Sequence, residues 1–196
     1  MALHQFGTIR KKATTMNDIV DPVPGRSIVL IGLMGAGKTS VGKRLAARLD
    51  RPFVDSDHEI EAAAGQDIPS IFSTLGEEAF RDGERRVIGR LLTGPAKVIA
   101  TGGGAWMNAD TRAAIGEQAI SVWLDAKLNT LYGRVADKPG RPLLDGQDAR
   151  KVLEDLMAAR YPVYQQADVR VLSTAGANHE KMVDRIIAAL EQGMKP

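Results

Sequence analysis

Gly32-Leu33-Met34-Gly35-Ala36-Gly37-Lys38-Thr39 fits the phosphate-binding pattern G-x-x-x-x-G-K-[ST]. Residues 27–31 before this loop are predicted to form a buried strand, and residues 40–49 after it a helix. The glycines let the backbone approach an anion, so that N–H groups and the helix N-terminus converge on phosphate oxygens. Lys38 adds a positive charge, and the Thr39 hydroxyl can ligate Mg²⁺. We therefore predict binding of a nucleoside triphosphate; the alternative is a glycine-rich turn with a chance lysine.

The composition indicates one globular domain. A chain of 196 residues with 44% hydrophobic content can bury one α/β core. The 26 basic and 24 acidic residues nearly cancel, so no nucleic-acid-binding surface is indicated. The absence of cysteine excludes disulfides, thiolate metal sites and thiol nucleophiles. No apolar run approaches the roughly 18–20 residues that a membrane span needs, and we expect a cytoplasmic protein without a membrane partner.

The first 25 residues differ from the rest of the chain. They carry three consecutive basic residues at 10–12, show no periodicity, and end in two prolines and a glycine. We predict a flexible arm over residues 1–25 and a single domain over residues 26–196. A true start at Met16 and a weak targeting segment are alternatives, but the apolar stretch of a secretion signal is missing.

Strand-like and helix-like patterns alternate along the rest of the chain. Further strands are predicted at residues 52–55, 97–101, 119–124 and 168–172. Further helices are predicted at residues 57–64, 68–75, 77–93, 108–116, 128–135, 148–161 and 178–191. This alternation predicts a parallel sheet with helices on both faces. About residues 136–148, which are rich in proline, glycine and charge, form a candidate mobile lid.

Two carboxylates follow the second predicted strand. Asp55 and Asp57 are two residues apart, so in an extended segment their side chains would point the same way. Near a triphosphate, one can hold Mg²⁺ through water while the other accepts a proton from a hydroxyl. The alternative is that Asp57 only caps the next helix.

The helix predicted from residue 77 carries an acid on its apolar stripe. Phe80, Glu84, Val87 and Leu91 are spaced by four, three and four residues. A buried carboxylate needs a partner, and Arg81 lies three residues before Glu84. Such a pair would orient the guanidinium to grip a planar carboxylate. An ordinary exposed ion pair is the alternative.

Thr101-Gly102-Gly103-Gly104 ends a buried strand with three residues that lack side chains. Because glycine costs conformational entropy, we infer that something needs the room, such as a substrate approached by backbone N–H groups. A wide turn is the alternative. Arg134, Arg141 and Arg160 are further basic candidates; Arg141 lies in the candidate lid, and each alone could be a solvated surface arginine.

Six motifs together resemble the shikimate kinase family. In order they are GLMGAGKT at 32–39, DSD at 55–57, FRDGE at 80–84, ATGGG at 100–104, RPLL at 141–144 and RYPVY at 160–164. The resemblance covers roughly residues 26–190. It implies a P-loop NTPase fold of the nucleoside-monophosphate-kinase type: a three-layer α/β architecture with a five-stranded parallel sheet in the order 2-3-1-4-5, substrate-binding helices and a mobile lid. It also implies ATP-dependent phosphorylation of the 3-hydroxyl of shikimate, a step towards chorismate and the aromatic amino acids.

The resemblance also implies roles for individual residues. The expected ATP-binding residues are Gly35, Ala36, Gly37, Lys38, Thr39, Ser40, Arg134 and Arg141, with Arg134 near adenine. Mg²⁺ is expected at Thr39 and, through water, at Asp55. The expected substrate-binding residues are Asp57, Arg81, Gly103, Gly104 and Arg160, with Glu84 orienting Arg81. Lys38, Asp57 and Arg141 are the expected catalytic residues. Because the family mostly works as monomers, we expect a monomer.

One departure from the family pattern follows Arg160. The family usually continues with a run like glutamate-valine-alanine, whereas this chain has Pro162-Val163-Tyr164, which leaves the following turn open.

Two other functions are alternatives. Another small-molecule kinase of this fold, acting on gluconate or a nucleotide, would not obviously need FRxxE beside DxD. A GTP-binding switch or regulatory ATPase could use Asp125, at the end of a predicted strand, as a magnesium ligand. The chain has no N-K-x-D motif for guanine, and residues 137–140 spell D-x-x-G without a preceding buried strand. We interpret Asp125 as the end of a strand on the far side of the first one.

Overall fold

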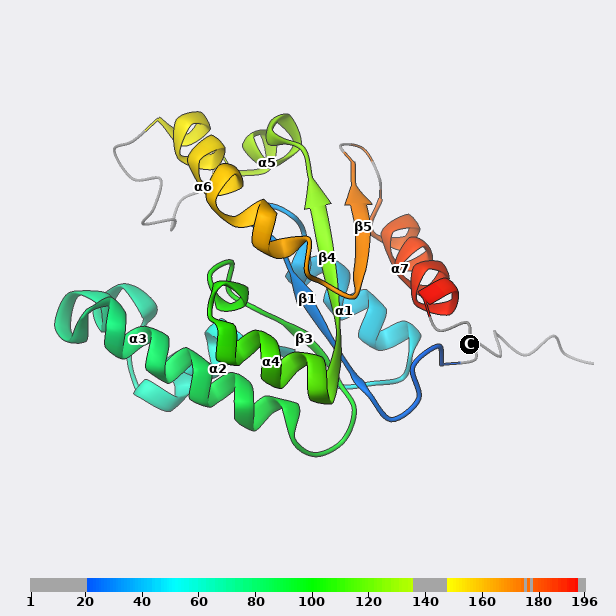
Figure 1. The fold of residues 1–196 in the computed structure, drawn as a ribbon, viewed down its shortest axis with the longest axis horizontal. Coiled ribbons are helices and arrows are strands. Elements are labelled where there is room, and N and C mark those ends of the chain that lie inside the picture. The colour runs from blue at the N-terminus through cyan, green and yellow to red at the C-terminus, as the bar shows by residue number, and fades with distance from the viewer. Residues whose placement is uncertain (1–20, 136–147, 175, 177, 194–196) are drawn as a thin grey trace, which may run out of the picture.

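The computed structural model describes residues 21–135, 148–174, 176 and 178–193, and its elements alternate as the sequence predicts (Figure 1). The strands are β1 (Ser27–Ile31), β2 (Phe53–Asp55), β3 (Val98–Ala100), β4 (Ala119–Ala126) and β5 (Val169–Ser173). The helices are α1 (Lys38–Arg48), α2 (Ser56–Ala64), α3 (Ile68–Leu92), α4 (Ala109–Gln118), α5 (Leu128–Val135), α6 (Ala149–Tyr164) and α7 (His179–Gly193), with a 3-10 turn, η1 (Ala105–Met107).

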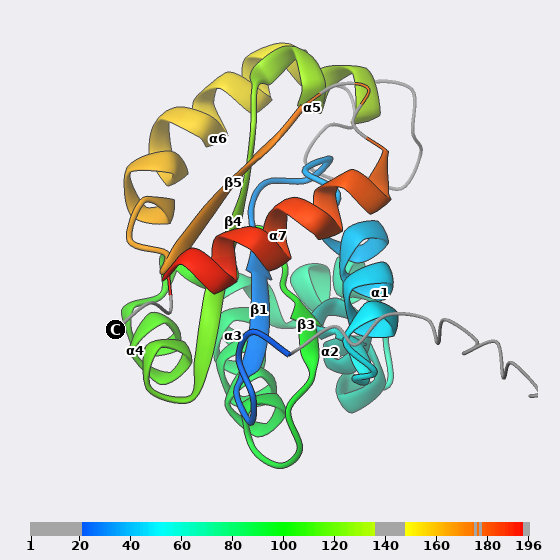
Figure 2. The ribbon, with the colours of Figure 1, turned by 90° about the vertical axis from the view of Figure 1, so that its right-hand side faces the viewer.

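The five strands form one parallel sheet in the order β2-β3-β1-β4-β5, which confirms the predicted order. β1 is fully buried at its centre, between β3 and β4. Helices α1 and α7 cover one face of the sheet, while α3, α4 and α6 cover the other (Figures 1 and 2). The sheet order changes direction at β1 and β3, and ligands of open parallel sheets bind beyond the carboxyl ends of strands at such a point.

Local sequence explains where several helices begin and break. Asp67, Asn108 and Asp148 each accept a backbone N–H bond in the first turn of α3, α4 and α6, as capping residues do. The two helices predicted around Gly76 form one element with a break at that glycine, whose φ of 83° lies in the left-handed region. The helix predicted to end at Tyr161 instead continues through Pro162.

The described end of the predicted arm is attached to the domain. Val23 is buried, and its carbonyl accepts a hydrogen bond of 2.8 Å from Arg51. Arg51 also pairs with Asp21 and donates to the carbonyl of Arg26 at 2.7 Å. Residues 1–20, including the alternative start at Met16, lie outside the described part of the chain, so the arm stays a prediction. Within the described part, no helix is long and apolar enough to cross a membrane.

Candidate active site

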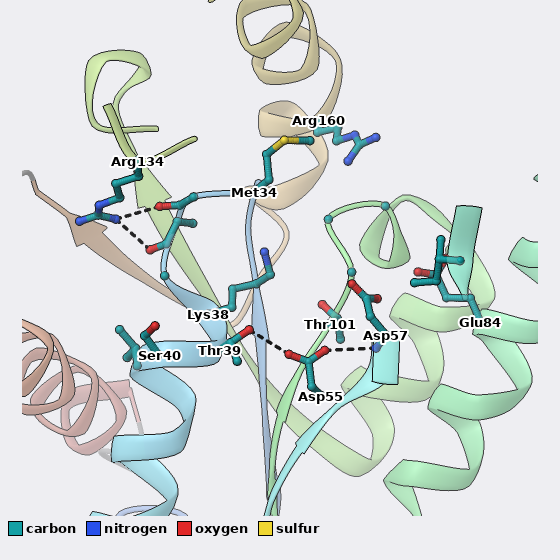
Figure 3. A pocket seen from close by; sticks show the side chains of 18 of the residues that line it. Met34, Lys38, Thr39, Ser40, Asp55, Asp57, Glu84, Thr101, Arg134 and Arg160 are labelled. Carbon is teal, nitrogen blue, oxygen red and sulfur yellow. Dashed lines mark hydrogen bonds between the residues drawn. The ribbon is translucent and has the colours of Figure 1, made fainter. Parts of the chain in front are cut away.

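A cleft of about 1220 Å³ lies at the carboxyl edge of the sheet. It exceeds the roughly 300–1,000 Å³ of a typical single-ligand pocket, which leaves room for a nucleotide and a second small molecule. Figure 3 shows that its walls come from the phosphate loop, the start of α2, α3, the glycine loop after β3 and α6. The predicted site residues that line it are Gly35, Ala36, Gly37, Lys38, Thr39, Ser40, Asp55, Asp57, Arg81, Glu84, Gly103, Gly104, Arg134 and Arg160. Arg141 lies outside the described residues.

The phosphate loop places the N-terminus of α1 at this cleft. Gly37, with a φ of 101°, precedes α1 where α2, α3, α4 and α6 have a capping side chain, and α1 has neither a side-chain cap nor an acid in its first turn. The N–H groups at the start of a helix and the positive end of its dipole favour an anion at this position. The ammonium of Lys38 donates to the carbonyls of Gly32 at 2.7 Å and Leu33 at 3.1 Å, which holds it at the loop.

Thr39 and Asp55 form a pair of oxygen ligands beside this loop. The Thr39 hydroxyl donates to Oδ2 of Asp55 at 2.8 Å, and Oδ1 of Asp55 accepts the backbone N–H of Asp57 at 3.2 Å (Figure 3). Asp55 is thus the cap of α2. The predicted alternative, a cap formed by Asp57, is wrong because Asp57 already lies in the first turn of that helix.

Asp57 reaches the cleft by a different geometry from the one predicted. The extended segment ends at Asp55 and α2 begins at Ser56, so the two carboxylates are not alternate side chains of one strand. Both nevertheless line the cleft. Burial and, to a lesser extent, the nearby charge of Asp55 raise the pKa of Asp57 to about 6, while Lys38 acts in the opposite direction. A carboxylate with this pKa is suited to accept a proton near neutral pH.

Glu84 is buried on α3 and orients Arg81, as predicted. Its side chain pairs with Arg81 Nη1 at 2.7 Å, and the residue is 3% exposed. Phe80, Val87 and Leu91 are buried on the same stripe. Burial raises the pKa of Glu84, and the hydrogen bond from Arg81 opposes this shift. Glu77 holds the other edge of the guanidinium at 3.3 Å, so two carboxylates of α3 fix the direction of Arg81.

The three glycines after β3 leave room for charged side chains of the cleft. A Cβ at Gly102 would lie 2.7 Å from Oδ1 of Asp57 and 3.1 Å from Oε1 of Glu84. A Cβ at Gly104 would lie 2.5 Å from Nη1 of Arg81, and one at Gly103 would lie 3.2 Å from Nη1 of Arg160. The loop is therefore more than a wide turn. Its backbone lies so close to these charged side chains that any side chain in the loop would obstruct them.

Arg134 donates hydrogen bonds to backbone carbonyls of the phosphate loop. Its Nη1 donates to the carbonyl of Gly35 at 2.9 Å and to the hydroxyl of Ser173 at 3.1 Å (Figure 3 shows the first). Ser173, at the end of β5, in turn donates to the carbonyl of Ala36 at 3.1 Å. Sequence reasoning missed Ser173, since a serine after an alternating strand gives no signal. The expected place of Arg134 near adenine stays a prediction.

Asp125, the residue on which the ATPase alternative depends, is engaged elsewhere. β4 lies on the opposite side of β1 from β3, as predicted for the strand that carries Asp125. Its carboxylate accepts a hydrogen bond of 3.0 Å from Nε of Arg170, and Asp125 is absent from the described residues that line the cleft. The D-x-x-G stretch at residues 137–140 lies outside the described residues.

Comparison with known proteins identifies the family. The family model for shikimate kinase matches residues 34–191. A shikimate kinase of Caulobacter vibrioides is 54% identical over 177 residues, which are 90% of this chain and 88% of that protein. The chain belongs to the shikimate kinase family.

Solved structures agree with this membership of the shikimate kinase family. A shikimate kinase from Acinetobacter baumannii in complex with shikimate has a TM-score of 0.80 and 37% identity, and the match covers 87% of this chain and 96% of that one. A gluconokinase from Sinorhizobium meliloti, at 18% identity and a TM-score of 0.55, shares the fold. As a shikimate kinase family member, the chain is a kinase that uses ATP.

Proposed function

We propose that this protein transfers the γ-phosphoryl group of ATP to the 3-hydroxyl of shikimate, giving ADP and shikimate 3-phosphate. The observation that carries the proposal is the arrangement of Arg81, Arg160 and Asp57 around the glycine loop, in one cleft with the phosphate loop. Two arginines suit a carboxylate, and a carboxylate with a raised pKa suits a hydroxyl. The chorismate pathway is the proposed context.

The acceptor is held by groups on three elements. Arg81 on α3 and Arg160 on α6 grip its carboxylate, and the backbone of Gly103 and Gly104 contacts its ring. Asp57 binds the ring hydroxyls and takes the proton of the 3-hydroxyl. At the same time the oxygen of the 3-hydroxyl bonds to the γ-phosphorus, and the bond between the γ-phosphorus and ADP breaks. Positioning of the two substrates provides much of the rate, since phosphoryl transfer needs little covalent help from a protein.

The nucleotide lies on the phosphate loop. Lys38 and the N-terminus of α1 bind its phosphates, Arg134 lies beside adenine, and Arg141 is the lid arginine that reaches both substrates. The oxygen donors of Thr39 and Asp55 fit Mg²⁺, the first directly and the second through water. When bound, the ion would neutralise part of the negative charge on the phosphates. We also propose that the protein acts as a monomer in the cytoplasm, as its membership of the family suggests.

A panel of acceptors tests this function. ADP formation is measured with ATP and Mg²⁺ in the presence of shikimate, gluconate, AMP or no acceptor. We expect ADP only with shikimate, because the other acceptors do not offer a carboxylate and ring hydroxyls in the spacing of Arg81 and Asp57. ADP release that needs no acceptor would instead favour the ATPase alternative and make Asp125 the residue to mutate.

Arg81→Ala is expected to raise the KM for shikimate by about ten- to a hundredfold, the cost of losing hydrogen bonds to a charged group. The KM for ATP should change less than threefold. Arg90→Ala is the matched control, since Arg90 lies on the same helix in an exposed pair with Glu59. A rise in the KM for ATP alone would contradict the assignment of Arg81 to the acceptor carboxylate.

A further inference from the structure

Tyr164 is a fully buried tyrosine in the last turn of α6, and none of the roles above uses it. Its side chain is 0% exposed, and its hydroxyl donates a hydrogen bond to the carbonyl oxygen of Gly103. Burial raises the pKa of Tyr164, so the phenol stays protonated and remains a donor at neutral pH. The two partners are 61 positions apart in the sequence, so no local pattern predicts this contact.

The acceptor of this bond belongs to a rigid peptide unit. The carbonyl of Gly103 and the N–H of Gly104 lie in one plane, because the peptide bond between them does not rotate. A hydroxyl that fixes the carbonyl therefore also fixes the direction of the Gly104 N–H. Glycine has the widest choice of backbone conformations, so this loop needs such a restraint more than other loops do.

A second hydrogen bond joins the same two segments. The indole Nε1 of Trp106, in the 3-10 turn directly after the glycine loop, donates to the carbonyl of Val163 at 3.1 Å. Trp106 is buried. The loop is thus attached to the last turn of α6 at both Gly103 and Trp106. Both contacts involve residues of the helical turn that contains Pro162.

Arg160 lies one turn before Tyr164 on α6, so the two side chains are on the same face of the helix. Its guanidinium reaches the glycine loop, where Nη1 would lie 3.2 Å from a Cβ at Gly103. Any shift between α6 and the loop would therefore change the distance from Arg160 to the N–H of Gly104. Both groups belong to the acceptor side of the cleft.

We propose that Tyr164 is a positioning residue for the acceptor: its hydroxyl holds the Gly103–Gly104 peptide at a fixed distance from Arg160, so that both contact shikimate together. The inference rests on the proposed function, in which Arg160 and the glycine loop bind the acceptor. Tyr164 itself touches neither substrate. Removal of the Tyr164 hydroxyl should weaken binding of the acceptor and not of ATP, because this hydroxyl donates no hydrogen bond to the phosphate loop.

Tyr161 provides a matched control. It lies on the same helix, and its hydroxyl also donates to a backbone carbonyl, that of Ala126 in β4. Both tyrosine rings pack against Trp123, with ring centroids 5.0 Å away for Tyr161 and 6.0 Å for Tyr164. Phenylalanine in place of either tyrosine keeps the ring and removes the hydroxyl with its hydrogen bond to a backbone carbonyl. Only the bond of Tyr164 ends on the glycine loop.

The test compares Tyr164→Phe, Tyr161→Phe and wild type in steady-state kinetics and thermal unfolding. We expect Tyr164→Phe to raise the KM for shikimate roughly three- to tenfold, the worth of one hydrogen bond, with the KM for ATP unchanged. Tyr161→Phe should leave both KM values unchanged while lowering the melting temperature similarly. Equal kinetic constants in the two variants, or a rise in the KM for ATP in Tyr164→Phe, would overturn the proposal.

Hydrogen exchange gives a readout that does not depend on turnover. The amides of residues 103–107 should exchange faster in Tyr164→Phe than in Tyr161→Phe, because only the first variant releases the glycine loop. Equal exchange at these residues would also overturn the proposal. A wild-type protein that fails to phosphorylate shikimate would count against the proposed function instead, and the exchange comparison would still decide whether Tyr164 holds the loop.

Discussion

Lys38→Ala is expected to lower kcat about a hundred- to a thousandfold, the cost of removing one preorganised charge from a developing transition state. The ammonium of Lys38 lies at the phosphate loop, where it is held by the carbonyls of Gly32 and Leu33. Those carbonyls keep its charge beside the positions assigned to the transferring phosphate. Steady-state ADP formation with saturating shikimate measures the effect.

The fold should survive this change. Alanine is a good helix former, and Lys38 is the first residue of α1, so the melting temperature should stay within about 4 °C of wild type. Lys43→Ala is the control, because Lys43 is an exposed lysine on the same helix and its removal changes net charge equally. A loss of activity no larger than that of Lys43→Ala would contradict the role given to Lys38.

Asp57→Asn is expected to lower kcat/KM about a hundred- to ten-thousandfold, because an amide cannot accept the hydroxyl proton. The substitution keeps the shape of the side chain, so packing against Gly102 should be preserved. Asp82→Asn, at an exposed position on α3, controls for the loss of one negative charge. Activity near that of wild type would show that Asp57 only binds ring hydroxyls.

The pH profile of the wild-type protein provides an independent measurement of the same role. Asp57 is active when ionised and its pKa is raised to about 6, so kcat/KM should fall below pH about 6 and level off above it. The direction follows from the raised pKa: an unperturbed aspartate would keep activity constant down to about pH 4. Asp57→Asn should lose this acidic limb, and a limb of unchanged midpoint in the variant would assign it to another group.

Patterns with short spacing predicted the fold and part of the site well. The apolar stripe of α3 placed Glu84 in the interior because helical period and burial are local properties of a segment. Its pairing with Arg81 followed, since a carboxylate there needs a partner and an arginine three residues away can reach it. The sheet order and family followed from the motifs together.

Predictions that depended on the exact residue at which a strand ends or a helix begins were less successful. The direction of Asp57 was inferred from an extended backbone, but α2 starts one residue earlier because Asp55 caps it. A shift of one residue at the boundary changes which way a side chain points. The contacts of Tyr164 and Ser173 could not be inferred, since their partners are distant in sequence and are backbone carbonyls without a residue-specific pattern.

The uncapped start of α1 has a consequence for stability. A helix with glycine in place of a capping side chain forgoes about a few tenths of a kcal/mol, and Gly37 adds the entropic cost of glycine. A capping oxygen at this position would occupy the place that the phosphate needs. Without a ligand, the start of α1 therefore lacks the stabilisation that a capping side chain would provide. A bound nucleotide supplies this stabilisation through its phosphates, so the ligand acts as the N-terminal cap of the helix.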